Sequence, residues 1–273
     1  MPLPNYTYGT FQLNDGVNYF VTDKKLGLPE VQESVFKVAR YPGVKTTGTI
    51  INERRATVTV VVVGSSRTDL ESKVDALLLA LNQRQQQLAI HMLDGRYLVC
   101  DAISAPVTYR STRLLAVTIQ ITFLAVDPYL YAANASSYDS GSIAYTLVSG
   151  SNYTSGNLVV ASSGTEYAYP TIALTNNSAV TITAFTLSQN PDGTSLQISN
   201  LSWTQGETIT IGCDPRQANG YTVVSSAAPG TLLAFSGTFP VIEPTGTVLT
   251  LQVTASAQPT VDLAATWTPR WLS

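Results

Sequence analysis

Histidine is the most frequent general acid or base of enzymes, and the chain contains only one, His91. It stands between Ile90 and Met92 in a segment whose pattern predicts a β-strand. A Ser–His–Asp arrangement would have to use this single imidazole, and the sequence contains neither a G-x-S-x-G turn nor a glycine-rich phosphate loop. We interpret His91 as a structural or interface residue and predict no catalytic residues.

Paired carboxylates are a second possible chemistry, because two acids on either side of a glycosidic bond can hydrolyse it. Five of the acids considered have a structural place instead, and the other three form no recognisable pair. A glycosidase or cell-wall hydrolase is therefore a minor alternative. The acids concerned are Asp69, Glu71 and Asp75 on a predicted helix, Asp94 and Asp192 in turns, and Glu207, Asp214 and Glu243 in the second half.

Thiol and metal chemistry have little support. The two cysteines, Cys100 and Cys213, are far apart, and no C-x-x-C pair or Cys/His cluster provides zinc ligands. We predict two buried free thiols, with a disulfide between two domains as the alternative. We predict no metal site and no cofactor.

Aromatic side chains could bind ligands or partners. They could stack on sugar rings, anchor a protein interface, or fill the core and rim of a β-sandwich, and the last interpretation is preferred. Loss of glycan binding on Trp203→Ala would favour the sugar. The residues are Tyr129, Tyr131, Tyr138, Tyr145, Tyr153, Tyr167 and Tyr169, with Trp203, Trp267 and Trp271.

Charge is scarce in this 273-residue chain, where 12% of residues are charged and 44% are apolar. An average domain carries about 25% charged residues. Either neighbouring subunits cover much of the surface, or hydroxyl and amide groups solvate it. The net charge of −3 and the lack of any basic run argue against a dedicated nucleic-acid binder. Residues 1–5 do not resemble a secretory signal and no apolar run could span a bilayer, so we expect synthesis in the cytoplasm and no membrane contact.

The first half predicts a sheet with one helix. A β-branched run at 57–63 predicts a strand, and a helix is expected at Asp69–Gln83, capped by a Thr68-x-x-Glu71 box. Its apolar face is expected to pack on its own sheet, and an oligomer seam is the alternative. That face consists of Leu70, Val74, Leu77, Leu78 and Leu81.

Further along, 88–92 and 97–101 flank Asp94-Gly95 and predict a β-hairpin. Residues 116–123 alternate as a strand. We therefore predict a first domain over 1–131, then a low-charge linker with early strands over 132–168. From 169 to 273, short β-segments and turns recur without a helix pattern, which predicts a β-sandwich of jelly-roll or galectin-like type.

The order of several motifs resembles the distal tail protein family of siphophages, the phages with long flexible tails. The most specific is Phe123-Leu-Ala-Val-Asp-Pro-Tyr129, which is similar to the F-x-x-x-D-P-Y close of that family's first domain. The closing Trp267-Thr-Pro-Arg-Trp-Leu272 is similar to its terminal strand. Other matching segments are Phe11–Gly16, Glu53–Val63, Tyr169–Ile172, Gln205–Asp214 and Phe239–Gly246, although Gly212-Cys213 before Asp214 departs from the family pattern.

The resemblance implies a mainly β chain with a tail-tube-like sandwich carrying one helix, then a galectin-like sandwich. It also implies a non-enzymatic virion protein that forms a homo-hexameric ring at the tail tip. Such a ring joins the tail tube protein to the tail-tip hub protein, and it anchors side fibres or a receptor-binding protein. DNA would be met only in transit through the lumen. The alternative is a carbohydrate-binding adhesion module of the tail tip.

One segment suggests how a ring could close. Residues Tyr41–Arg55, with Lys45–Gly48 at the expected tip, precede the strongest predicted strand. We hypothesise that they form a hairpin arm that reaches a neighbouring subunit, and a loose surface loop is the alternative. No specific binding residue is assigned from the sequence.

Overall fold

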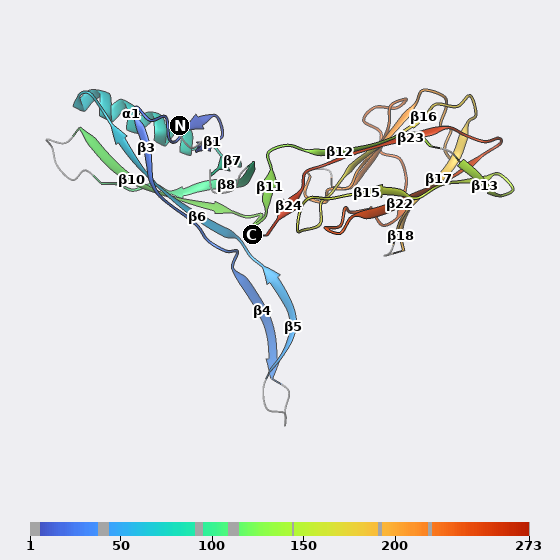
Figure 1. The fold of residues 1–273 in the computed structure, drawn as a ribbon, viewed down its shortest axis with the longest axis horizontal. Helices are drawn as coiled ribbons and strands as arrows, with labels where there is room; N and C mark the ends of the chain where they lie inside the picture. The colour runs from blue at the N-terminus through green and yellow to red at the C-terminus, as the bar shows by residue number, and fades with distance from the viewer. Residues whose placement is uncertain are drawn as a thin grey trace. The chain divides into compact units, whose positions relative to one another are not determined.

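The computed structural model describes residues 6–37, 44–90, 95–108, 115–143, 145–190, 193–217 and 220–272. The chain divides into two compact units, residues 1–133 with 272–273, and residues 134–271 (Figure 1). Strands dominate both units, and the one helix in the described residues lies in the first unit. The predicted mainly β fold with one helix in the first half is confirmed.

The first unit is built on an antiparallel sheet in the order β2-β1-β7-β8-β10-β6-β3. Ten consecutive residue pairs join β10 to β6 without a bulge, from Ala116↔Val63 to Ala125↔Arg54. Val117, Ile119, Ile121 and Phe123 are buried, as their alternation predicted. The strands are β1 (Thr7–Tyr8), β2 (Phe11–Gln12), β3 (Tyr19–Leu26), β6 (Arg54–Val63), β7 (Gln86–Ala89), β8 (Arg96–Ser104), β9 (Val107–Thr108), β10 (Ala116–Ala125) and β11 (Leu130–Ala132).

The expected hairpin between 88–92 and 97–101 is present as the antiparallel pair β7–β8, in the register Leu88↔Leu98. Its turn, including Asp94, lies outside the described residues, and so does His91.

Helix α1 (Arg67–Leu81) begins two residues before the predicted start. The predicted Thr68/Glu71 capping box is wrong, because Ser66 is the N-cap and its Oγ accepts a hydrogen bond from the Asp69 backbone N–H at 3.1 Å. The Asp69 carboxylate in turn accepts hydrogen bonds from the backbone N–H and Oγ of Ser65. Starting earlier lets two serines satisfy the first turn, where an acid also opposes the positive end of the helix dipole.

The helix packs against β6, as predicted, with Leu70, Val74, Leu77 and Leu81 buried. Leu78 departs from the prediction because it is only half-buried. Leu79, one position further around the helix, is exposed. The last turns of α1 are therefore apolar on the outer side as well as on the inner side.

A two-stranded ribbon, β4 (Val31–Lys37) with β5 (Val44–Ile51), continues from the sheet (Figure 1). Backbone hydrogen bonds from Gly27 to Arg55 and from Asn52 to Glu30 connect it to the β3–β6 pair. Among the described residues, β4 and β5 pair with no other strand. A hairpin is present, but the predicted bounds are wrong, because its first strand lies before Tyr41. The expected tip is also wrong, since Lys45–Gly48 lie within β5. Residues 38–43 lie outside the described residues.

The second unit is a β-sandwich of two antiparallel sheets. One sheet has the order β12-β23-β16-β19-β20, and the other has β13-β14-β22-β17-β18-β21 with β15 also on β22. The strands of the two sheets are β12 (Ser136–Ser142), β13 (Tyr145–Ser149), β14 (Asn152–Ser155), β15 (Leu158–Val160), β16 (Thr171–Asn176), β17 (Ile182–Asn190), β18 (Thr194–Ile198), β19 (Thr208–Gly212), β20 (Thr222–Ser225), β21 (Ser236–Gly237), β22 (Thr247–Ala255) and β23 (Val261–Trp267). The short strand β24 (Arg270–Trp271) lies outside both sheets.

Both sheets contribute to one apolar core, which includes Ile172, Phe185, Trp203, Leu251 and Leu263. The low-charge segment after residue 132 is more ordered than a linker, because it supplies β12 to one sheet and β13, β14 and β15 to the other. It therefore forms part of the sandwich, and does not only lead into it.

Candidate assembly interface

The acids considered for catalysis each bind different neighbours through hydrogen bonds or an ion pair. Asp214 pairs with Arg216 at 2.8 Å, and Glu207 accepts hydrogen bonds from Thr204 and Ser225. Glu243 accepts a hydrogen bond from the Gln189 side chain at 3.2 Å. Asp192 lies outside the described residues. The described part of the chain thus offers these carboxylates as parts of turns and loops and not as a facing pair.

Both cysteines are free and buried, as predicted. Burial raises the pKa of Cys100 to about 12, with a further contribution from the nearby Asp101 charge. Burial also raises the pKa of Cys213. Because the thiolate is the nucleophile, both sulfurs are held in an unreactive form at neutral pH.

The residues described bring together no three His, Cys, Asp or Glu side chains able to hold a metal ion. Across the same residues, no helix combines the length and apolar character needed to cross a bilayer.

The tryptophans proposed to stack on sugars are mostly core residues. Trp203 is 1% exposed, packs on Phe185 with ring centroids 5.8 Å apart, and donates Nε1–H to the Glu207 carbonyl at 2.8 Å. Trp267 is also buried. The idea that Trp203→Ala would test glycan binding is therefore wrong, because that change would damage the core. The preferred interpretation, sandwich core, fits both residues.

The predicted tyrosines divide in the same way. Tyr131 and Tyr145 are buried, and Tyr138 and Tyr153 pack against the sandwich core from its margin. Tyr167 is largely exposed. Their clustering in the sequence therefore reflects mainly packing, not a single aromatic surface.

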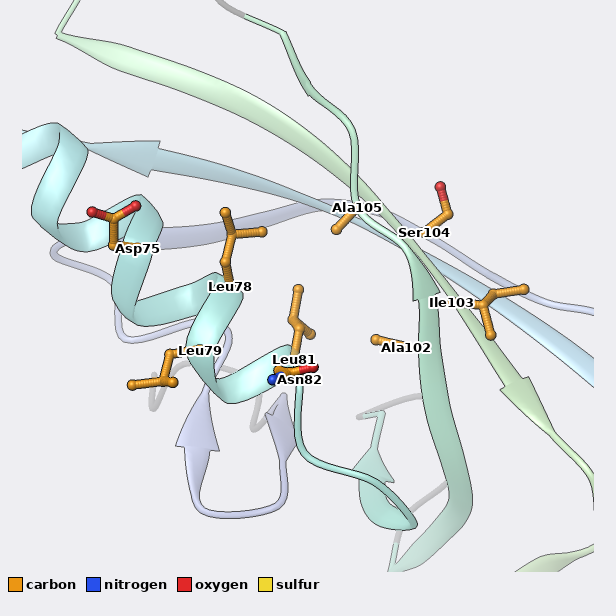
Figure 2. Close-up of a pocket in the computed structure, with 9 residues that line it drawn as sticks. All are labelled: Asp75, Leu78, Leu79, Leu81, Asn82, Ala102, Ile103, Ser104 and Ala105. Carbon is orange, nitrogen blue, oxygen red and sulfur yellow. The ribbon is translucent and has the colours of Figure 1, made fainter.

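The first unit has an open groove of about 550 Å³ between the C-terminal half of α1 and the end of β8. Figure 2 shows the helix residues on one side and Ala102–Ala105 on the other. Leu79 is 73% exposed and Ile103 is also exposed. An apolar side chain left in water loses about 1.5–3 kcal/mol that burial would provide. The groove is lined by Asp75, Leu78, Leu79, Leu81, Asn82, Ala102, Ile103, Ser104 and Ala105.

Hydrogen bonds fix the groove walls relative to each other. The Tyr8 hydroxyl donates to the Gln83 carbonyl at 2.8 Å, just after the helix, and lies 3.3 Å from the Cys100 carbonyl of β8. The Asp101 carboxylate accepts from the Gln85 backbone N–H at 2.5 Å. These contacts hold the end of α1 against β8, so the groove is a preformed surface.

Two acids of α1, Glu71 and Asp69, form ion pairs, whereas a third, Asp75, pairs with no described residue. Arg67 pairs with Glu71 at 3.0 Å, and Lys73 pairs with Asp69 at 2.8 Å. The hydrogen bond from Lys73, with those from Ser65, lowers the pKa of Asp69 to about 2. Asp75, at the groove, forms no ion pair with any described residue and leaves the rim acidic.

This arrangement suits protein docking better than small-molecule chemistry. A preformed apolar groove with an acidic rim can take an apolar segment that carries basic residues. The sequence could not reveal the groove, because its two walls come from segments that are twenty or more positions apart. The one available signal was the run Leu77-Leu78-Leu79, which is too apolar for a helix with one buried face.

The comparisons with known proteins agree with a tail protein. Residues 10–125 match the phage tail protein RIFT-related domain family. No curated protein matches the sequence.

Among solved structures, the Dit protein (gp 19.1) of phage SPP1 aligns over 97% of this chain and 98% of its own, at 15% identity and a TM-score of 0.71. That protein is described as a paradigm of the hub adsorption apparatus in phages that infect Gram-positive bacteria. A chain of the phage p2 baseplate in its strontium-activated conformation covers 96% of this chain and 98% of its own, with 10% identity and a TM-score of 0.50.

The SPP1 likeness extends over both units, so the expected two-part fold of the distal tail family is confirmed as a fold. The comparisons therefore show that residues 10–125 match a phage tail protein family and that the chain over 97% of its length has the fold of the SPP1 Dit protein.

Proposed function

We propose that the chain is a non-enzymatic ring subunit at the distal end of a long phage tail, assembled in the host cytoplasm. Six copies would form a ring that joins the tail tube protein to the tail-tip hub protein and anchors fibres or a receptor-binding protein. The observation that carries the proposal is the combination, in one unit, of a ribbon that pairs with no other strand of the described residues and an open groove with exposed apolar side chains. A ring needs two such complementary surfaces on each copy, because its interfaces are head-to-tail.

The sequence of the ribbon segment and the groove rim also carry opposite charges. The segment from Lys37 to Lys45 carries three basic residues and no acid, while the groove rim carries Asp75. In our proposal the β4–β5 ribbon of one copy lies over the groove of the next. This contact would cover Leu79 and Ile103 and give Asp75 a basic partner.

The domain roles follow from the same idea. Residues 1–131 would form the ring, and residues 169–273, with the strands from 132–168, would form a galectin-like sandwich that carries partners outward. DNA would pass through the lumen without a dedicated binding site.

The test begins with the purified chain and with tail tips taken from virions. Light scattering should give the mass of six copies, and negative-stain images should show six-fold rings. Rings that need a partner would form when the tail tube and hub proteins are added. Tail tips in which this chain is absent from every rotationally symmetric layer would contradict the proposal.

A ribbon deletion tests the mechanism of closure. Residues 35–47 are removed, and Ser34 is joined to Gly48 by Asn-Gly, a turn that suits a two-residue hairpin. We expect a folded subunit that no longer forms rings. A six-fold ring of the deleted chain would show that the ribbon is not the connecting element.

A carbohydrate-binding role is the second candidate. Its best remaining support is an exposed aromatic group in the second unit, where Tyr221 stacks on Phe239 at 4.4 Å and Phe235 contacts Phe239 edge-on at 4.8 Å. A glycan array with the full chain and with Tyr221→Ala tests this role, and it replaces the Trp203 substitution.

A further inference from the structure

Arg54 is a buried arginine of the first unit. It is the first residue of β6, pairs in register with Ala125 of β10, and is 1% exposed. Arginine keeps its positive charge in proteins, because its pKa lies above about 12. Taking such a charge out of water is costly unless a carboxylate and hydrogen bonds replace the water. Arg54 should therefore have an acidic partner.

The described residues do not provide that partner. The Nη2 atom of Arg54 donates a hydrogen bond to the Leu272 carbonyl, but Nε and Nη1 are buried and donate to no described residue. No described carboxylate forms an ion pair with Arg54. Burial lowers the pKa of Arg54, and no charge of a described residue offsets this shift. Within the described part of the subunit, the charge is therefore buried and uncompensated.

Two other arginines show the usual pattern. Arg55, the next residue, is exposed and pairs with Glu53 at 3.5 Å. Arg270 is buried, and its Nη1 atom donates to the Tyr167 carbonyl at 3.0 Å. Natural proteins depart from such rules mainly at functional sites, where another requirement offsets the loss of stability. The departure at Arg54 therefore indicates a site.

Leu272 and Leu28 determine how a partner could reach the guanidinium. Leu272 belongs to the first unit, is half-buried, and follows β24, the last strand of the described residues. Residues that follow the last strand of a domain are among the easiest to displace. Leu28 is 80% exposed and lies in the connection beside the start of β6, where the Gly27 N–H donates to the Arg55 carbonyl at 3.0 Å. A partner that covers Leu28 can therefore approach Arg54 once the Leu272 carbonyl moves aside.

We propose that Arg54 is a binding site for a carboxylate that another chain of the tail tip supplies. This Asp or Glu side chain replaces the Leu272 carbonyl and accepts two parallel hydrogen bonds from the guanidinium, a geometry that suits arginine. Assembly then compensates the charge that the free subunit buries alone. The carboxylate comes from a neighbouring copy or from a different tail protein, and the chemistry is the same for both. This inference rests on the proposed assembly into a tail tip, but not on the number of copies in the ring.

Electron cryomicroscopy of tail tips from virions, and of rings of the purified chain, tests the proposal directly. In tail tips we expect carboxylate oxygens within about 2.7–2.9 Å of two guanidinium nitrogens of Arg54. The same contact in purified rings identifies a neighbouring copy as the source, and a contact confined to tail tips identifies a different protein. If Arg54 in tail tips binds only the Leu272 carbonyl, water or a small ion, the proposal is overturned. A chain that forms no rings contradicts the proposed function, while the tail-tip map still decides about Arg54.

Matched variants test the energetic consequence. Arg54→Met removes the charge and keeps a long, flexible side chain, so the free subunit should melt at the same temperature as the unchanged chain or higher. Arg270→Met is the control and should melt at a lower temperature, because the Tyr167 carbonyl loses its donor.

Assembly should respond in the opposite way, because Arg54→Met leaves the partner's carboxylate unpaired. Rings should need a subunit concentration at least about ten-fold higher if a neighbouring copy supplies the carboxylate. Otherwise mass spectrometry of virions should find one tail-tip protein missing. Normal rings together with complete tail tips overturn the proposal. A free Arg54→Met subunit that melts well below the unchanged chain also overturns it, because the guanidinium would then stabilise the fold by itself.

Discussion

Replacing Leu79 by alanine should weaken ring assembly without weakening the subunit. The side chain is 73% exposed at the groove, so little of it contributes to the fold. Full burial of a leucine is worth about 1.5–3 kcal/mol, and covering the exposed three quarters would therefore contribute about 1–2 kcal/mol at each interface. Alanine has the higher helix propensity, so the stability of the free subunit should change by no more than about 0.5 kcal/mol.

In a closed ring each copy contributes one such interface, so the loss per subunit is also about 1–2 kcal/mol. About 1.4 kcal/mol corresponds to a factor of ten, and the subunit concentration at which rings form should rise by roughly that factor. Light scattering over a dilution series measures this midpoint. Val126→Ala is the control, because Val126 is 71% exposed and does not line the groove.

If the Leu79→Ala and Val126→Ala variants both form rings at the same subunit concentration as the unchanged chain, Leu79 does not lie in the interface. The reasoning also fails if Leu79→Ala lowers the melting temperature of the free subunit, because Leu79 would then belong to the fold and not to an interface.

Two further predictions concern the second unit and the thiols. Asn176→Ala should destabilise the second unit by about 2–4 kcal/mol, because the buried side chain donates to the Val180 and Trp203 carbonyls and accepts from Ser178. Chemical denaturation measures this loss, and Gln197, which is exposed on β18, provides a control whose alanine variant should cost less than about 0.5 kcal/mol. Cys100 and Cys213 should resist a thiol-reactive dye at pH 7 in the folded chain and react fully in denaturant, since burial raises the pKa of both thiols. Rapid labelling of the native protein would contradict that account.

Periodic patterns predicted the parts of the fold in which local sequence and burial agree. The alternation at Val117–Phe123 and the helical spacing of Leu70, Val74 and Leu77 both correspond to buried faces. The helix start was misplaced because Ser66-x-x-Asp69 and Thr68-x-x-Glu71 are two overlapping capping patterns. Their local sequences are equally suitable, and the contacts of Ser65 with Asp69 favour the first.

The rest of the site depends on distant residues that no local pattern reveals. Trp203 lies between two polar residues, Ser202 and Thr204, a local pattern that is typical of an exposed segment. Its backbone nevertheless pairs with that of Ile182, and its side chain is buried in the core. The low charge over 132–168 suggested a linker with early strands, although low charge equally suits strands inside a sandwich. The groove needs Ala102 opposite Leu81, and only the fold brings these residues together.

The continuity of the ribbon has a mechanical consequence. Four residues, 27–30, separate β3 from β4, and two, 52–53, separate β5 from β6. Backbone hydrogen bonds join these two short connections to each other, so a pull on the ribbon reaches β6 through hydrogen-bonded backbone. β6 is held to β10 by an unbroken ladder of ten residue pairs, and strands pulled along their length load such a ladder in shear, with all of its bonds sharing the force. In the proposed ring, a tail tip that bends on contact with a cell surface would therefore transmit the strain from one subunit to the next through these hydrogen bonds.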